Sequence, residues 1–156
     1  MKAPLLALIF CSFLVGCGCN TNRPSAKNNC YTDYVESQKY ALKQAVFFPT
    51  KSSILIKIGE GSLGAVPDTL EKFQKNPAAW DVALLPAGTV IKVIQIAYTS
   101  SFDAGPHIWI NANIVTGKLA GEKCLLDFIS NRTQKHDPYI IVPMVDTNIL
   151  EVISKP

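Results

Sequence analysis

The chain contains, in its second half, the alternating stretch His107-Ile108-Trp109-Ile110-Asn111-Ala112-Asn113-Ile114-Val115-Thr116. Side chains of a β-strand point alternately to the two faces of a sheet. The even-numbered residues from 108 to 114 are all apolar and are expected to face a core. The odd-numbered residues from 107 to 113 then share the opposite face. Alternation over the eight residues 107–114 predicts a half-buried strand and makes a β fold the first interpretation.

Further segments around this strand have the composition of strands bounded by turn residues. Residues 40–48 and 54–58 are predicted to be strands that pair as a hairpin. Residues 90–98 carry Val, Ile and Ala at both parities, which predicts a central strand buried on both faces. Residues 80–85 lead into the turn before residues 90–98. The remaining predicted strands are residues 125–130, 139–142 and 149–153, with turns at residues 131–133 and 145–148.

A single short helix is expected at residues 67–75. Leu70 and Phe73 have helical spacing, Pro67 and Asp68 suit a helix start, and Asn76-Pro77 prevents continuation. Six or seven short strands with one helix, and no alternation of strands with long helices, predict a mainly β fold, a small barrel.

Composition restricts the function classes. The 156 residues include 15 Lys and Arg and 12 Asp and Glu, a net charge of +3, and 48% of them are hydrophobic. The basic residues are scattered singly, which argues against a nucleic-acid partner, because neutralising phosphates requires clustered Lys and Arg. The hydrophobic content supports a packed domain rather than a disordered segment.

The N-terminus divides the chain into three parts. Lys2 precedes an apolar run over residues 5–15, which is shorter than the roughly 20 residues that a membrane-spanning helix needs. Leu14-Val15-Gly16-Cys17 closes that run, and a polar segment without periodicity follows it. We therefore expect a signal peptide at residues 1–16, a tether at residues 17–30 and one β domain at residues 31–156.

Residues 14–17 resemble the lipobox of bacterial lipoproteins. The resemblance implies that the Cys17 thiol is acylated and that the mature chain begins at this residue; Cys19 is the rival modification site. It also implies a bilayer partner through acylated Cys17 and a periplasm-facing position in the outer membrane, since no Asp follows Cys17, with the inner membrane as the other possibility. An ordinary secretory signal cut elsewhere is the alternative interpretation.

Three cysteines would remain in the mature chain besides Cys17. We consider a disulfide between Cys30 and Cys124, which would join the start of the domain to a strand. Two free thiols, with Cys124 as a small buried residue, are the other possibility. A metal site is not expected, because no Cys-x-x-Cys occurs and His107 and His136 are far apart without ligand-spaced partners. No cofactor is expected either.

The segment from Leu85 to Val93 contains Pro86-Ala87-Gly88-Thr89 before an aliphatic run. It resembles the turn that leads into a strand of bacterial SH3-like domains, and this resemblance implies that the small barrel is SH3-like. The chain is also similar to small lipoproteins of unassigned role. In the SH3-like family the implied activity is binding of peptides or cell-wall stems. No binding residue of that family can be transferred to a position here.

The candidate binding surface is the polar face of the alternating strand, with Trp109, His107 and Asn111. Trp109 either anchors a partner there or lies under a loop or in a second small core. The loop at residues 59–64 is a second candidate. Its Gly-x-Gly-x-x-Gly letters follow a strand, but no long helix follows them, so we interpret it as a turn.

Catalytic motifs are not recognisable in the chain. No Gly-x-Ser-x-Gly elbow or thiol-protease pattern occurs, and pairing of Asp103 with Asp127 cannot be judged from sequence. The leading hypothesis is a non-catalytic binding or structural module of the cell envelope, with a protein or cell-wall partner. The alternatives are an immunity or inhibitor lipoprotein, and an envelope-polymer hydrolase that would use His107, Asp103 and His136.

Overall fold

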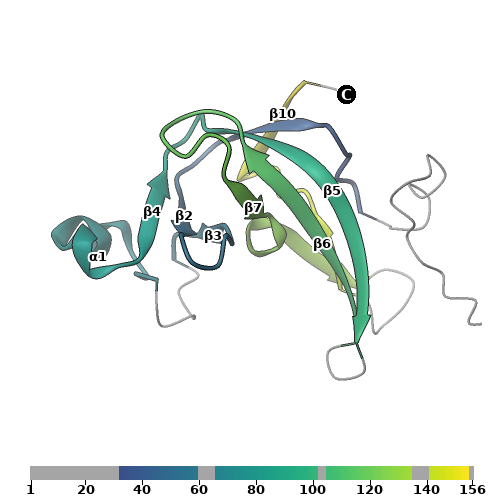
Figure 1. Ribbon diagram of the computed structural model, residues 1–156, viewed down its shortest axis with the longest axis horizontal. Helices are drawn as coiled ribbons and strands as arrows, with labels where there is room; N and C mark the ends of the chain where they lie inside the picture. The colour runs from purple at the N-terminus through teal and green to yellow at the C-terminus, as the bar shows by residue number, and fades with distance from the viewer. Residues whose placement is uncertain (1–31, 60–65, 102–104, 135–140, 155–156) are drawn as a thin grey trace, which may run out of the picture.

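A computed structural model describes residues 32–59, 66–101, 105–134 and 141–154 (Figure 1). These residues form a mainly β domain, which confirms the expected fold class. The elements in chain order are β1 (Lys39–Leu42), β2 (Val46–Pro49), β3 (Ile56–Lys57), α1 (Leu70–Lys75), the 3-10 helix η2 (Pro77–Ala79), β4 (Val82–Leu85), β5 (Val90–Ser101), β6 (Gly105–Ile114), β7 (Lys123–Leu125), the 3-10 helix η3 (Asp127–Ile129), β8 (Asn131–Gln134), β9 (Ile141–Met144) and β10 (Leu150–Ser154).

The strands are distributed between two sheets. The larger sheet has the order β10-β1-β5-β6-β9-β8, with β7 also paired to β6, and the smaller sheet has the order β3-β2-β4. All strand pairs are antiparallel except β6 with β9. Figure 1 shows the long, bent β5–β6 pair on one side of the molecule and the small sheet with α1 on the other. The amide of Leu55 donates to the carbonyl of Leu125 at 3.0 Å, which ties the two sheets together.

The expected strand at residues 40–48 is two strands that belong to different sheets. Lys43 and Gln44 are exposed between them, and the Lys43 amide donates to the Ile149 carbonyl at 2.7 Å. The chain therefore leaves the large sheet after β1 and enters the small sheet at β2. The prediction of one continuous strand was wrong because a run of β-forming residues does not show where a turn redirects it. The expected pairing with residues 54–58 is confirmed by β2 and β3.

Burial on both faces belongs to β2 rather than to β5. Val46 and Phe48 lie in the main core, while Phe47, which points the opposite way, packs with Ile56 and Val66 in a second cluster. The small sheet thus separates two apolar layers, and its central strand supplies side chains to each.

In β5, the apolar residues at both parities reflect a β-bulge. Val93 pairs with Ala112 and Gln95 with Asn111, so Ile94 is an extra residue against β6. An extra residue shifts the alternation by one position. Ile91 and Val93 before the bulge are buried, Ile96 and Tyr98 after it pack against the same core, and Ile94 is 41% exposed. The prediction of a strand buried on both faces was therefore wrong.

The turn before β5 has the expected position. Gly88 adopts a φ of +83°, a left-handed conformation that side chains with a Cβ rarely adopt. The Thr89 hydroxyl donates to the Pro86 carbonyl at 2.8 Å, and the Gly88 amide donates to the Leu42 carbonyl at 2.7 Å. These bonds fix the direction in which β5 leaves the turn, beside β1.

The helix lies within the predicted segment and ends where expected, but it begins at Leu70 rather than at Pro67. The Thr69 hydroxyl caps α1 by accepting a hydrogen bond from the Lys72 amide at 3.2 Å, and Asn76 ends the helix before Pro77. The Phe73 ring lies 5.4 Å from the Phe47 ring, measured between centroids. This contact holds α1 against the second apolar layer.

The C-terminal third differs from the expectation in two places. Only residues 123–125 of the segment before position 131 are a strand, and Asp127–Ile129 forms η3 instead of extended chain. Residues 131–133, expected as a turn, belong to β8. The conformation of this segment depends on distant strands: β7 pairs with β6, and β8 pairs with β9, which lies later in the chain. The turn at residues 147–149 precedes β10 as expected.

The main core lies on the inner face of the large sheet and includes Tyr40, Ile91, Ile108, Ile110 and Leu126. Over the parts of the chain that the structure describes, no helix has the length and apolar character needed to cross a bilayer.

Candidate functional site

The two faces of β6 have different environments, as the alternation predicts. Ile108, Ile110, Ala112 and Ile114 are each at most 2% exposed. His107, Trp109 and Asn111 are half-buried on the other face. The structure therefore confirms the predicted orientation of the three candidate residues. Trp109 is half-buried. This burial is intermediate between the exposed partner anchor and the buried residue under a loop that the sequence left open.

His107 and Trp109 form a ring pair. Their ring centroids lie 4.1 Å apart at an interplanar angle of 50°. Because they are two residues apart on one strand, the pairing requires only that both rings lean along the strand. The result is a continuous aromatic surface on the side of the sheet opposite the core.

Polar and small residues of β5 surround this ring pair. The register places Gln95 opposite Asn111, and Ala97 opposite Trp109. Directly opposite residues share a face and lie close together. Small Ala97 leaves room beside the indole, while Gln95 and Asn111 bring amide groups, which donate and accept hydrogen bonds, to the same face.

His107 lies at the junction of β6 with β9, where it pairs with Ile141. Burial lowers the pKa of the imidazole, and the positive charge of Arg132 lowers it further. The imidazole is therefore neutral at pH 7. Its Nε2 atom is buried and has no hydrogen-bond partner among the described residues.

Arg132 enters the site from β8. Its Cζ atom lies 4.7 Å from the centroid of the Phe128 ring, a cation–π geometry that holds the guanidinium over an aromatic face. Because Arg132 is exposed, it adds a positive charge to the edge of the candidate surface.

A buried carboxylate lies beside the same strand, where the pairing along one edge of β6 is interrupted. β7 pairs with residues 111–113 of β6 and β9 pairs with His107, so η3 fills the interval between them. The Leu126 amide donates to the Ile110 carbonyl at 3.1 Å, which places the next residue, Asp127, in this interval.

Asp127 is 1% exposed, and neither carboxylate oxygen has a hydrogen-bond partner in the described part of the chain. Burial raises the pKa of the carboxyl group to about 6. The nearby amides of Asp127 and Ile110 and the charge of Arg132 oppose this shift but do not cancel it. A buried charge without partners is unfavourable, so the protonated form is favoured up to this pH.

The position of Asp127 is fixed by hydrogen bonds on either side of it. The Ser130 hydroxyl donates to the Leu126 carbonyl at 2.6 Å, so the Tyr34 hydroxyl donates to Ser130 Oγ at 2.7 Å. Burial raises the pKa of Tyr34 well above its ordinary value, so the phenol stays neutral and keeps its proton for this bond. These bonds position the backbone on both sides of Asp127.

The sequence shows Asp127 as the acid inside the apolar run Leu125-Leu126-Asp127-Phe128-Ile129, and that pattern is the signal that could have indicated its burial. From the sequence, Asp127 is a candidate only as a possible partner of Asp103. Arg132 was placed in a turn, and its proximity to His107 could not be inferred because β8 joins the sheet through β9.

Several predicted residues lie outside the described ranges, namely Cys17, Cys19, Cys30, Asp103, His136 and most of the loop at residues 59–64. Cys124 is described: it is a thiol 2% exposed in the main core, and burial raises its pKa to about 12. Its pairing with Cys30 stays a prediction. Within the described ranges, no group of three or more His, Cys, Asp or Glu residues is arranged to hold a metal ion.

Comparisons of the chain with protein-family models, with curated proteins and with solved structures find no match. The candidate site therefore rests on the residues and geometry given above.

Proposed function

We propose that this protein is a bacterial envelope lipoprotein, anchored through acylated Cys17 and facing the periplasm from the outer membrane. Its β domain acts as a non-catalytic binding or structural module, as the resemblance to SH3-like domains implies. Its partner is an envelope protein or a cell-wall component. The observation that carries the binding role is the half-buried His107–Trp109 pair on the sheet face that the core does not use.

The composition of this face supports binding. An aromatic side chain supplies a large contact area at low conformational entropy cost, and Trp is enriched among residues that dominate binding energy. Asn111 and Gln95 lie next to the ring pair and can fix the orientation of a ligand through hydrogen bonds. Because these residues lie on paired strands rather than on loops, their positions are set before a partner arrives.

The anchor is supported by residues 14–17 and by the short polar segment that follows them. If Cys17 carries the lipid, about 15 residues separate it from Thr32, where the described domain begins. A flexible segment of that length spans roughly 20 Å, which keeps the domain near the bilayer surface. Cys17→Ala should leave an unprocessed precursor or release the protein from the membrane fraction, as measured by intact mass and fractionation. Retention of a Cys17→Ala protein of mature mass would contradict the anchor.

Asp127 does not favour the alternative of a hydrolase. A raised carboxyl pKa is a feature of many catalytic acids. However, Asp127 is 1% exposed, so its carboxyl group is not accessible to a polymer substrate.

The test of the binding role is partner capture by paired tryptophan variants. Trp109→Ala should reduce recovery of cross-linked envelope partners at least tenfold, because it removes the aromatic part of the surface. Trp80→Ala is the matched control: Trp80 is also half-buried but follows η2, next to the small sheet, and its removal should leave recovery unchanged. Equal losses in the two variants would contradict a site on β6.

A further inference from the structure

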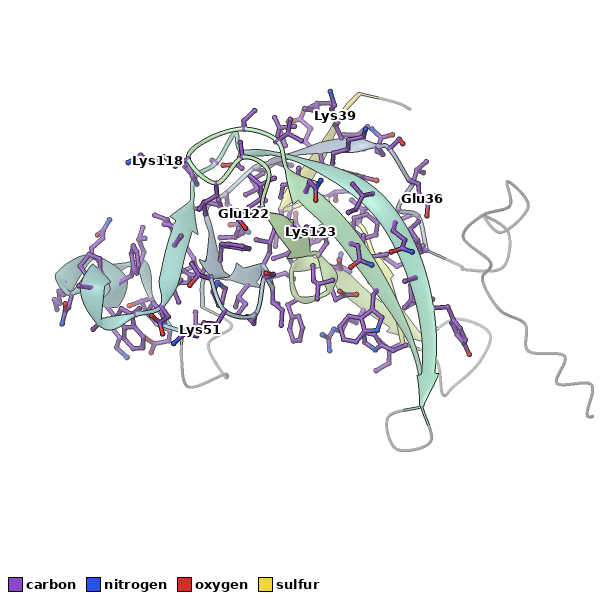
Figure 2. All side chains as sticks on the ribbon, viewed as in Figure 1. Glu36, Lys39, Lys51, Lys118, Glu122 and Lys123 are labelled. Carbon is purple, nitrogen blue, oxygen red and sulfur yellow. The ribbon has the colours of Figure 1, made fainter. Side chains whose placement is uncertain are left out.

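The outer face of the large sheet carries a transverse row of lysines. Lys39 on β1 is directly opposite Lys92 on β5, Lys92 is opposite Asn113 on β6, and Asn113 is opposite Lys123 on β7. We call Lys39, Lys92 and Lys123 the basic row. Figure 2 labels its two ends, Lys39 on the upper strand and Lys123 toward the middle of the molecule.

All three lysines point away from the core. Tyr40, Ile91 and Cys124, the chain neighbours of Lys39, Lys92 and Lys123, are each at most 2% exposed on the inner face. Because adjacent residues of a strand face opposite ways, the lysine side chains emerge together on the outer face.

The opposed lysines Lys39 and Lys92 destabilise the sheet unless an external anion neutralises their charge. Like charges directly opposite each other on neighbouring strands destabilise a sheet. None of the ion pairs formed within the described residues involves the basic row, whereas Lys51, Lys72 and Lys75 all pair with carboxylates elsewhere. The charge of the basic row is therefore available to an external anion.

Two acidic residues lie near the row and do not neutralise it. Glu151 is opposite Ala41, at the sheet edge and one row away from Lys39. The Glu122 carbonyl accepts a hydrogen bond from the Ile114 amide, which aligns Glu122 with a residue of the inner face. Among the described residues, no ion pair joins either glutamate to a lysine of the basic row.

Exposed apolar side chains border the same row. Val115 is 40% exposed two residues beyond Asn113, and Ile94 is 41% exposed two residues beyond Lys92. Ile153, the residue of β10 between the partners of Lys39 and Tyr40, is 47% exposed. Basic side chains interspersed with exposed aliphatic ones are the composition of surfaces that lie on an anionic bilayer, where both charge and apolar contact contribute.

We propose that the basic row and its apolar border form the face of the domain that rests on anionic phospholipid headgroups. This inference extends the proposed function, since the short segment after an acylated Cys17 would hold the domain within reach of such a surface.

Vesicle sedimentation of the mature-length chain from residue 17, with Cys17→Ser so that no acyl chain is present, tests the proposal. The chain should bind vesicles of phosphatidylglycerol and phosphatidylethanolamine, and bind phosphatidylcholine vesicles at least tenfold less. Each basic side chain near an anionic surface strengthens binding about fivefold. The triple variant Lys39→Gln, Lys92→Gln, Lys123→Gln should therefore weaken binding by up to about 100-fold.

The charge-matched control is Lys51→Gln, Lys72→Gln, Lys75→Gln, which removes three lysines that are already paired with carboxylates. It should change binding less than twofold, and thermal melts should show that both triple variants fold. The proposal would be overturned if both triple variants lost vesicle binding equally. It would also be overturned if the unsubstituted chain bound phosphatidylcholine vesicles as well as anionic ones, or bound neither. A basic-row variant that keeps its vesicle binding but loses binding to a soluble polyanion such as polyphosphate would overturn it as well.

Intact mass of the full-length protein from cells separates this result from the proposed function. Absence of acylation would contradict the anchor and leave the vesicle result standing. Acylation with no vesicle binding by the unacylated chain would overturn the basic face alone.

Discussion

The two faces of β6 differ in what their side chains contact, although they belong to the same ten-residue strand. Ile108, Ile110 and Ile114 fill the main core, while His107, Trp109 and Asn111 lie half-buried on the other side. The inner face is determined by packing, and the outer face retains aromatic and amide groups that the core does not need. In such a strand, even-numbered residues stabilise the fold and odd-numbered residues remain available for binding. Substitutions at adjacent positions should therefore have different consequences.

The largest expected effect is on the inner face. Ile110→Ala should lower the free energy of unfolding by about 2–5 kcal/mol, because it removes buried methyl groups and leaves a cavity. Ile110 has no exposed surface, so its neighbours must collapse or leave the space empty. Urea unfolding measures the change. The adjacent Asn111→Ala is the control and should cost less than about 1 kcal/mol; a similar loss in both would show that parity does not separate the faces.

Next in size is the buried carboxylate at the edge of β6. Burial raises the pKa of folded-state Asp127 to about 6, above the ordinary value of 3.8. The resulting contribution to stability is therefore fully present below pH 3.8. This contribution is lost as the pH rises through about 6. Asp127→Asn removes the charge at nearly constant volume and should therefore stabilise the protein at pH 7.5 by about 3 kcal/mol.

Denaturation curves of wild type and Asp127→Asn between pH 3.5 and 7.5 measure this difference. It should be smallest at the acid end and widest above pH 6. His107 titrates in the same range with the opposite sign, since its pKa is lowered. Both proteins contain His107, so its contribution cancels in the comparison. Curves that stay parallel across the range would show that Asp127 is not buried as a charge.

The smallest stability effect is expected on the outer face. Trp109→Ala should lower the free energy of unfolding by about 1–2 kcal/mol, less than the ~3–5 kcal/mol for a fully buried aromatic, because the side chain is only half-buried. The same variant should lose partner capture. Thermal and urea unfolding decide between the two roles. A loss in the fully buried range would make Trp109 a structural residue and remove it from the candidate surface.

Much of the local structure could be predicted because it depends on neighbouring residues. The inner and outer sets of β6, the position of α1 and the turn before β5 follow from periodicity, capping and turn chemistry. The candidate residues Trp109, His107 and Asn111 were found for the same reason. Asp127 and Arg132 were not assigned to this region, because η3 and β8 obtain their positions from β6 and β9, which are distant in sequence.

The amino-acid sequence by itself determined that the domain is mainly β and which face of β6 meets the core, since a period of two is a property of consecutive residues. The tertiary structure alone decided where strands end and which sheet they join. The turn at Lys43 and Gln44 sends β1 and β2 to different sheets, and the extra residue Ile94 allows β5 to bury one face while carrying apolar residues at both parities. It also decided that Asp127 is buried. Strand register and burial depend on which distant segments pair, and those partners are fixed only when the whole chain has packed.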